Sequence, residues 1–352
     1  MREHLREPAQ LLARDSAEIG RAQAAAGLLR GGLHPAQVSS ALRLSGARVL
    51  HAHNLLPAFG WRALAAARAE GVRVVLHLHQ YRLVCAVGVC FTRGAECTRC
   101  HGRNTLPGIR LGCRGSAAEA LAYGASLALW QQRLLAQADA VIVPSHFARE
   151  RLRALGAPLP WERVHVIAPP LRAAEPETLD ATRAPDTPEG PYALVVARLA
   201  PEKGVDVAIA ACRTAGMPLV VAGDGPERGA LEAAAERHAV RFVGHVDGAR
   251  LQALRAGAAL ALAPSRFGET FGLSVAEALA AGLPVVASRV GSHPELLDPE
   301  ALVPAGDARA LAGAIERLSG NRDAGLRGRE RVRALCAPAA VARALASVYD
   351  GA

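Results

Sequence analysis

The sequence alternates short apolar runs rich in β-branched residues with longer stretches rich in Ala, Leu and Arg. This alternation is typical of parallel α/β units rather than of a β-sandwich or a helical bundle. In the first half we predict strands at residues 48–53, 73–78, 140–143 and 163–167. In the second half we predict them at residues 192–197, 218–222, 240–243, 259–263 and 284–287.

Residues 168–191 are rich in Pro, Glu, Thr and Asp and poor in large apolar residues, so we interpret them as a linker. We therefore expect Rossmann-like domains at residues 1–175 and 176–340, and a helix at 341–352 that packs back toward the first domain. Ligands of parallel sheets bind beyond the carboxyl ends of the strands. Two such domains would form their site in the cleft between them.

The charge of the chain is uneven. The 352 residues have a net charge of +9, but residues 1–175 alone carry 22 Arg against 11 Asp and Glu, a net charge of +11. The basic residues lack interleaved aromatics, and only 4% of the chain is aromatic, so we expect no nucleic-acid partner. An anionic membrane surface or a phosphate-bearing acceptor fits better. A general preference of this sequence for Arg explains the charge equally well.

The amino terminus does not have the layout of a secretory signal, because charged residues precede no continuous apolar run. The most apolar stretch, at residues 117–130, is shorter than the roughly 20 residues of a membrane span and contains Glu119. We expect a cytoplasmic protein, at most peripheral at the inner face of the membrane.

Two cations follow the predicted strand at 192–197 in one loop, Arg198 and Lys203. Lys203 is the only lysine of the chain. A planar guanidinium and a compact ammonium can together neutralise a diphosphate while it leaves. The alternative is a solvated charged turn.

Residues 265–273 follow the predicted strand at 259–263 and open a helix that is expected to end at Gly282. The free amides at the start of this helix can hold an anion. Glu269 and Glu277 are eight residues apart, and their carboxylates can accept hydrogen bonds from sugar and ribose hydroxyls. Alternatively, Ser274 and Glu277 form a capping box that only closes the helix start.

Two further groups follow predicted strands. Gly223 and Gly225 can line a nucleotide site, although a tight turn explains them better because a third glycine is missing. His77 and His79 end the strand at 73–78, and we expect their rings on opposite faces, with His79 reaching the cleft. His53 and Asn54 are secondary candidates.

Five of the seven cysteines lie between Cys85 and Cys113. The odd number argues against a secreted disulfide framework. Cys97 and Cys100 form a two-residue knuckle, and with Cys85 and Cys113 they could supply four thiolates to a structural Zn²⁺. A second knuckle is missing, so buried cysteines that only pack are the open alternative.

Taken together, residues 198–204, 223–226, 242–245 and 264–282 resemble, in this order, the motifs of glycosyltransferase family 4, retaining enzymes with the GT-B fold. The first domain is similar at 51–54 and 79–85, and the pattern of Cys97, Cys100 and Cys113 recurs in a bacterial subset. The resemblance covers nearly all of residues 47–349. Family members usually begin with a strand and a glycine-rich loop, whereas residues 8–46 here read as helices. The first domain is thus expected to lack its opening β-α unit.

The resemblance implies a hexosyltransferase that moves a sugar from a nucleotide diphosphate to a glycan or lipid-linked hydroxyl, with no required metal. It implies that Arg198 and Lys203 bind the diphosphate, that His79 lies at the reacting sugar and that Glu277 holds the ribose. The remaining implied donor contacts come from Glu269, Thr270, Phe271, Gly272, Leu273, Val243 and His245. The alternatives are a catalytically impaired nucleotide-sugar-binding or scaffold protein and a GT-B-fold epimerase.

Overall fold

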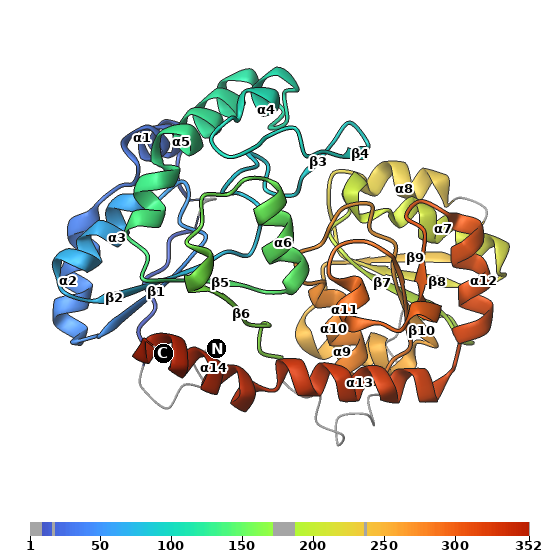
Figure 1. Ribbon diagram of the computed structural model, residues 1–352. Helices are drawn as coiled ribbons and strands as arrows, with labels where there is room; N and C mark the ends of the chain where they lie inside the picture. Colours follow the sequence, from blue (N-terminus) through green and yellow to red (C-terminus); the bar gives the residue numbers. More distant parts are fainter. Residues whose placement is uncertain (1–8, 16–17, 172–186, 236–237, 352) are drawn as a thin grey trace. The chain divides into compact units, whose positions relative to one another are not determined.

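The computed structural model describes residues 9–15, 18–171, 187–235 and 238–351. The chain divides into two compact units (Figure 1). The first comprises residues 1–92, 97–169 and 341–352, and the second comprises residues 93–96 and 170–340. The boundary predicted at residue 175 and most of the predicted linker lie outside the described residues.

The first unit is built on a four-stranded parallel sheet in the order β1-β2-β5-β6. Its strands are β1 (Val49–His53), β2 (Arg73–His77), β5 (Ala140–Val143) and β6 (Val164–Val166). The helices of this unit are α1 (Arg21–Arg30), α2 (Pro35–Ser45), α3 (Gly60–Ala69), α5 (Ala117–Ala136) and α6 (His146–Ala154). Among the described residues, β1 is the first strand of the chain.

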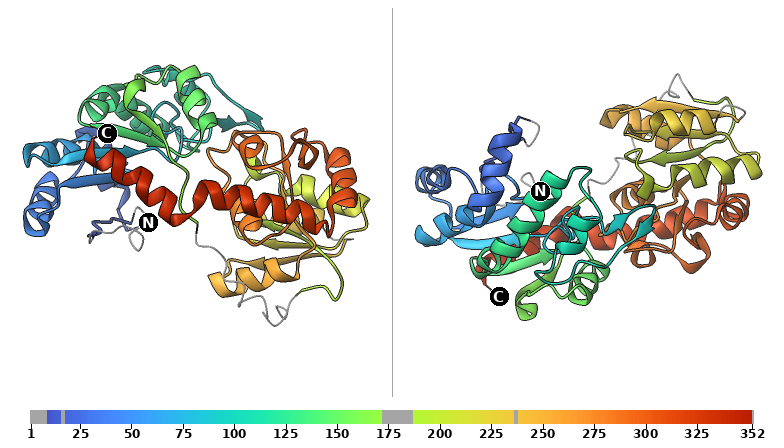
Figure 2. Two further views of the ribbon diagram at one scale, coloured as in Figure 1. Left: turned by 60° about the horizontal axis from the view of Figure 1, so that its bottom comes forward. Right: turned by 90° about the horizontal axis from the view of Figure 1, so that it is seen from above.

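Both faces of this sheet are covered, which explains its almost continuous apolar strands. Val74 and Val141 lie on one face in a core that includes residues of α2, α3 and α6. Val75 and Ile142 lie on the other face, against Val341, Leu345 and Val348 of α14 (Pro338–Asp350). Figure 2 shows α14, in dark red, lying along this sheet.

A long irregular segment separates β2 from α5. It contains the two-stranded pair of β3 (Phe91–Thr92) and β4 (Ala95–Glu96) and the short helix α4 (Leu106–Arg110). Five cysteines lie in this segment.

The second unit contains a six-stranded sheet in the order β12-β11-β10-β7-β8-β9, and every recorded pairing within it is parallel. The strands are β7 (Ala193–Val196), β8 (Leu219–Ala222), β9 (Val240–Gly244), β10 (Leu260–Ala263), β11 (Val285–Ser288) and β12 (Leu302–Val303). Its helices are α7 (Val205–Thr214), α8 (Arg228–Ala234), α9 (Gly248–Gly257), α10 (Leu273–Ala280), α11 (His293–Leu296), α12 (Ala308–Leu318) and α13 (Arg322–Cys336).

The sheet order places the ends of β7 and β10 side by side, so the loops that follow them are neighbours. Tyr192 shows how the core closes on one face of the sheet, because its ring is fully buried and its hydroxyl donates to the Leu254 carbonyl at 2.7 Å.

All nine predicted strands are confirmed, with ends that differ by at most one residue. The sequence prediction missed β3, β4 and β12, each of which has only two residues.

The prediction that 117–130 is the most apolar long stretch was wrong. The stretch Arg322–Asp350 passes as a candidate membrane span by length and hydropathy. It consists of α13 and α14, because Ala337 leaves the helical conformation before Pro338. One side of α14 is buried in the core of the first unit through Val341, Leu345 and Val348.

Candidate functional site

The loop after β7 holds the two predicted cations at its two ends. Arg198 forms an ion pair with Glu202, whose side chain is 8% exposed, whereas that of Arg198 is 58% exposed. Lys203 ends a short 3-10 helix at Pro201–Lys203. Gly204 then takes a φ of 65°, and a Cβ there would lie 2.2 Å from the Pro264 carbonyl oxygen. The loop is thereby locked against the end of β10.

Lys203 and Glu269 meet across these two loops. Lys203 Nζ lies 2.8 Å from Glu269 Oε1 and 4.9 Å from the centre of the Phe267 ring. The Ser265 hydroxyl donates to the same carboxylate oxygen at 2.6 Å. Burial alone would raise the pKa of Glu269, but the Lys203 ammonium and the hydrogen bonds from Lys203 and Ser265 hold that pKa below its ordinary value. Glu269 is therefore a carboxylate.

His293 belongs to this group, although the sequence did not single it out. Its ring is fully buried, and its Nδ1 lies 2.8 Å from the Ser288 carbonyl, to which it donates. Burial lowers the pKa of His293 despite the Glu269 carboxylate, so the ring is neutral. Its Nε2 is buried without a hydrogen-bond partner and faces Gly272. The only sequence signal was a histidine just after β11.

Helix α10 begins without a side-chain cap. Its N-cap is Gly272, in a left-handed conformation with φ 78°, and Leu273 is the first helical residue. The capping box between Ser274 and Glu277 is therefore wrong, because both residues lie inside the helix. The first amides of α10 stay available to an anion. Phe271 is buried, Thr270 is half-buried and Leu273 is exposed.

Glu277 lies on α10 and forms an ion pair with Arg255 of α9. The Arg255 side chain is only 5% exposed and that of Glu277 is 39% exposed. Glu277 thus neutralises a buried guanidinium and keeps part of its carboxylate open to solvent. The pairing was not predicted, since nothing in sequence links the two helices.

Gly223 and Gly225 pack closely against the backbone of residues 197–199. A Cβ at Gly223 would lie 1.9 Å from the Ala197 carbonyl oxygen, and one at Gly225 would lie 2.3 Å from that of Leu199. The turn therefore packs on the loop that carries Arg198, as the tight-turn interpretation requires. Val243 and His245 lie at the end of neighbouring β9, and His245 is exposed.

The first unit contains a stack of four histidines at the ends of β1 and β2. The rings of His77 and His79 stack with centres 4.2 Å apart, so the expectation that they point to opposite faces was wrong. Side chains two residues apart share a face. His53 Nδ1 lies 2.7 Å from His79 Nε2, and His51 Nε2 lies 3.2 Å from His77 Nδ1.

Burial and the neighbouring rings lower the pKa of His51 to about 3, that of His53 to about 4 and that of His77 to about 2. Burial also lowers the pKa of His79. The rings are therefore neutral at pH 7, and His79 offers an uncharged donor or acceptor. His51 Nδ1 lies 2.6 Å from the Tyr349 hydroxyl of α14.

Ligand atoms of His51, His53 and His77 lie within 4.8 Å of one another, the only such group of three or more found in the described part of the chain. Cys85, Cys97, Cys100 and Cys113 instead surround a separate pocket in the segment before α5. The second unit thus joins Lys203, Glu269 and the start of α10, while His79 belongs to the first unit.

Two family models match the chain. Glycosyl transferases group 1 matches residues 190–321, and Glycosyl transferase 4-like domain matches residues 3–170. The two matches correspond to the second and the first unit.

The curated relatives match only part of this chain. The glycogen synthase of Mycobacterium tuberculosis is 46% identical over 121 residues, 32% of this chain and 28% of that protein. The GDP-mannose-dependent alpha-mannosyltransferase of Mycolicibacterium smegmatis is 35% identical over 173 residues, 48% of this chain and 44% of that protein. The chain therefore spans less than half the length of these relatives.

Solved structures match the whole fold. Anabaena HepE in complex with UDP superimposes with a TM-score of 0.63 and 18% identity, covering 90% of this chain and 82% of that one. Sucrose-phosphate synthase from Thermosynechococcus elongatus superimposes with a TM-score of 0.65 and 22% identity, covering 95% of this chain and 81% of that one. These matches show the GT-B fold with its two α/β units. Together with the two family models they place the chain in glycosyltransferase family 4.

Proposed function

We propose that the chain transfers a hexose from a nucleotide-diphosphate sugar to a hydroxyl of a glycan or lipid-linked acceptor. The observation that carries this proposal is the contact of Lys203 with Glu269 beside the uncapped start of α10. One cation, one carboxylate and free helix amides stand together at the carboxyl ends of β7 and β10. This edge is where parallel sheets bind their ligands.

The charges of this group suit a leaving diphosphate. Lys203, Arg198 and the first amides of α10 stabilise the negative charge that grows on the phosphate as the bond to the sugar breaks. Lys203 then exchanges part of its interaction with Glu269 for the phosphate. The Glu269 carboxylate is left to accept hydrogen bonds from sugar hydroxyls.

Glu277 binds the ribose of the donor nucleotide. Its carboxylate is held by Arg255 but remains 39% exposed, so it can accept from the two ribose hydroxyls. Val243 and His245 then lie on the side of the base.

We further propose that transfer retains the anomeric configuration. The acceptor oxygen bonds to the anomeric carbon on the face that the phosphate leaves, and its proton passes to a phosphate oxygen. Such a reaction needs cations at the phosphate and no dedicated base, in agreement with the charges around Lys203. The chain acts in the cytoplasm, where nucleotide sugars are made, and the basic first unit favours acceptors at an anionic membrane surface.

The test is a donor panel that includes UDP-glucose and GDP-mannose, scored for released nucleotide with glycan and lipid acceptors. We expect release that depends on both donor and acceptor, and NMR of the product fixes the anomeric configuration. A folded protein that releases no nucleotide from any donor contradicts the proposal. Thermal stabilisation by a donor without turnover would instead indicate a binding or scaffold protein, and a changed sugar without acceptor an epimerase.

A further inference from the structure

The segment between β2 and α5 has little regular structure for its length. Two-residue strands and one short helix account for its elements, although loops longer than about 12–15 residues are uncommon in compact domains. Five of the seven cysteines of the chain are concentrated in it. A segment of this kind needs a local source of stability other than a sheet or a long helix.

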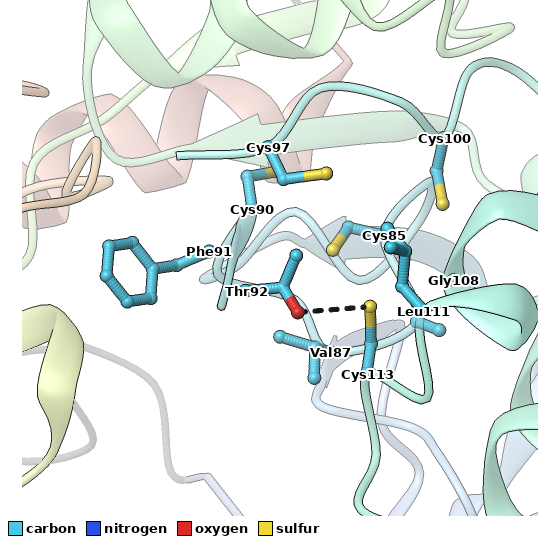
Figure 3. A pocket seen from close by; sticks show the side chains of 11 residues that line it. Cys85, Val87, Cys90, Phe91, Thr92, Cys97, Cys100, Gly108, Leu111 and Cys113 are labelled. Atoms are coloured by element: carbon cyan, nitrogen blue, oxygen red, sulfur yellow. Dashed lines mark hydrogen bonds between the residues drawn. The ribbon is translucent and has the colours of Figure 1, made fainter. Parts of the chain in front are cut away.

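The cysteines of this segment gather around one pocket. Cys85, Cys90, Cys97, Cys100 and Cys113 line it together with a few apolar groups. Figure 3 shows their sulfur atoms entering the pocket from different parts of the segment. None of the five forms a disulfide, and the Cys113 thiol contacts the Thr92 hydroxyl at 3.7 Å.

Backbone amides are directed at two of these sulfurs. The amides of Val87, Gly88 and Cys90 are hydrogen-bonded to the Cys85 sulfur, and the Gly108 amide to that of Cys100. Such amide-to-sulfur bonds orient and stabilise thiolates in the shell around a bound metal. A cysteine that only fills space in a core has no need of them.

Tight turns bring the cysteines together. Cys90 itself has a φ of 52°, and Arg93 and Gly94 also have positive φ values. The Cys97 amide donates to the Cys90 carbonyl at 2.7 Å, which closes the turn between them. These left-handed conformations are unfavourable for non-glycine residues such as Cys90 and Arg93, so other interactions of the segment must offset their cost.

Two guanidinium groups lie near the pocket, and one of them, that of Arg114, is also 3.7 Å from the Glu119 carboxylate. Arg82 interacts electrostatically with Cys85, and Arg114 donates to the Ala86 carbonyl at 3.1 Å. Four thiolates on one divalent cation carry a net charge of −2, which these guanidinium groups offset.

We propose that Cys85, Cys97, Cys100 and Cys113 bind one structural Zn²⁺ that links the parts of this segment to one another. Binding releases four thiol protons and involves no oxidation. Cys90 is buried and hydrogen-bonded to Cys85, so it supports a ligand rather than acting as one. Among the described residues, no three cysteine sulfurs lie within 4.8 Å of one another. Zn–S bonds of roughly 2.3 Å require closer sulfurs, so metal binding is expected to draw these side chains inward by rotation about their Cα–Cβ bonds.

The three histidines that lie closer together are the competing site. Four of their six ring nitrogens already lie at hydrogen-bond distance from one another, from His79 or from the Tyr349 hydroxyl, so most of the group is engaged without a metal. The cysteines have only weak hydrogen-bond partners. Thiolates are also the ligands of closed structural zinc sites.

The first test is the metal content of the full chain, purified without added metal and measured by mass spectrometry. We expect about one zinc per chain. The variants Cys97→Ser and Cys100→Ser lose it, while Cys212→Ser, a buried cysteine of the second unit, retains it. A wild-type chain without zinc, or serine variants that keep it, would overturn the proposal. Loss of zinc from His77→Gln with retention in Cys97→Ser would move the ion to the histidines and also overturn it.

A second test avoids variants that fail to fold. The wild-type chain is stripped with a chelator and refilled with Co²⁺, and the spectrum is expected to show thiolate-to-cobalt charge transfer with the intense visible bands of a tetrahedral site. Trypsin is then applied with and without the metal. Removal of the metal is expected to expose cleavage at Arg93, Arg99 and Arg103, and refilling to restore protection. A cobalt spectrum without thiolate-to-cobalt bands, or trypsin cleavage that is the same with and without metal, would overturn the assignment.

Discussion

Lys203 Nζ and Glu269 Oε1 lie 2.8 Å apart although the residues are 66 positions apart in sequence. Both side chains are mostly buried, with exposed fractions of 22% and 14%. Such a pair stabilises little in itself, because the Coulomb attraction is opposed by loss of hydration. Its value is to hold an ammonium in place before the donor arrives, which is how preorganised charges act in catalysis.

Replacing Lys203 by Met is therefore expected to lower the rate of transfer on the order of 100-fold or more, through lost stabilisation of the leaving diphosphate. Lys203→Arg restores the charge but not the compact geometry, so it is expected to recover only part of the rate. Nucleotide release is the measurement, and Arg213→Met, at an exposed position of α7, is the matched control. Equal rates for Lys203→Met and the control would remove Lys203 from the mechanism.

The single lysine also allows a chemical test. An amine-selective acylating reagent has two targets in this chain, Lys203 and the α-amino group. We expect a bound nucleotide sugar to protect Lys203 by covering its ammonium, and mass spectrometry of peptides reports the ratio of the two modifications. Modification of Lys203 that is the same with and without every donor of the panel would contradict donor binding at this residue.

Glu277 is expected to matter for stability as well as for the donor. Glu277→Ala leaves the Arg255 guanidinium, 5% exposed, without its partner, and we expect the free energy of unfolding to fall by about 1–3 kcal/mol. Glu277→Gln keeps a hydrogen-bond acceptor and should lose less. Urea unfolding measures both, with Glu316→Ala, at an exposed position of α12, as the control. If Glu277→Ala is as stable as the control, the ion pair is not a structural contact.

The strands could be predicted because local sequence decides them. The strand at 140–143 is buried on both faces, and such a strand has a continuous apolar sequence rich in β-branched residues, which can be recognised without the structure. The proximity of Lys203 and Glu269 could also be predicted, because the carboxyl ends of parallel strands lie at one edge of the sheet.

The remaining features depend on contacts that leave no local pattern. The start of α10 was misjudged because Gly272 in a left-handed conformation, rather than a serine side chain, sets it. Arg255 and His293 were missed because their roles arise only when α9, α10 and the end of β11 pack together. The face of His77 and His79 was predictable from strand periodicity, and the expectation failed because that periodicity was applied wrongly.

Gly223 supports the cation loop through close backbone contact. It has a φ of 136°, and a Cβ would approach the Ala197 carbonyl oxygen to 1.9 Å, so Gly223→Ala is expected to destabilise the fold by at least about 2 kcal/mol. Gly229, inside α8, has nothing within 4 Å of the position that an added methyl group would occupy, and Gly229→Ala should stabilise by about 0.5–1 kcal/mol. Thermal unfolding of the two variants gives the comparison. A stable Gly223→Ala protein would refute the close packing of this turn.

The four stacked histidines predict sensitivity of the first unit to acid. Their pKa values are lowered on folding, with His51 at about 3 and His77 at about 2, so the unfolded chain binds more protons between these values and about 6.5. Stability is therefore fully present above about pH 6.5 and falls as the pH is lowered, by about 1.4 kcal/mol per pH unit for each proton taken up. Urea unfolding of the whole chain from pH 7 to pH 4.5 measures the slope, and His77→Gln should reduce it by about one proton. His34→Gln, at an exposed position, is the matched control. A wild-type slope that His77→Gln does not alter would mean that this ring is not kept neutral by the fold.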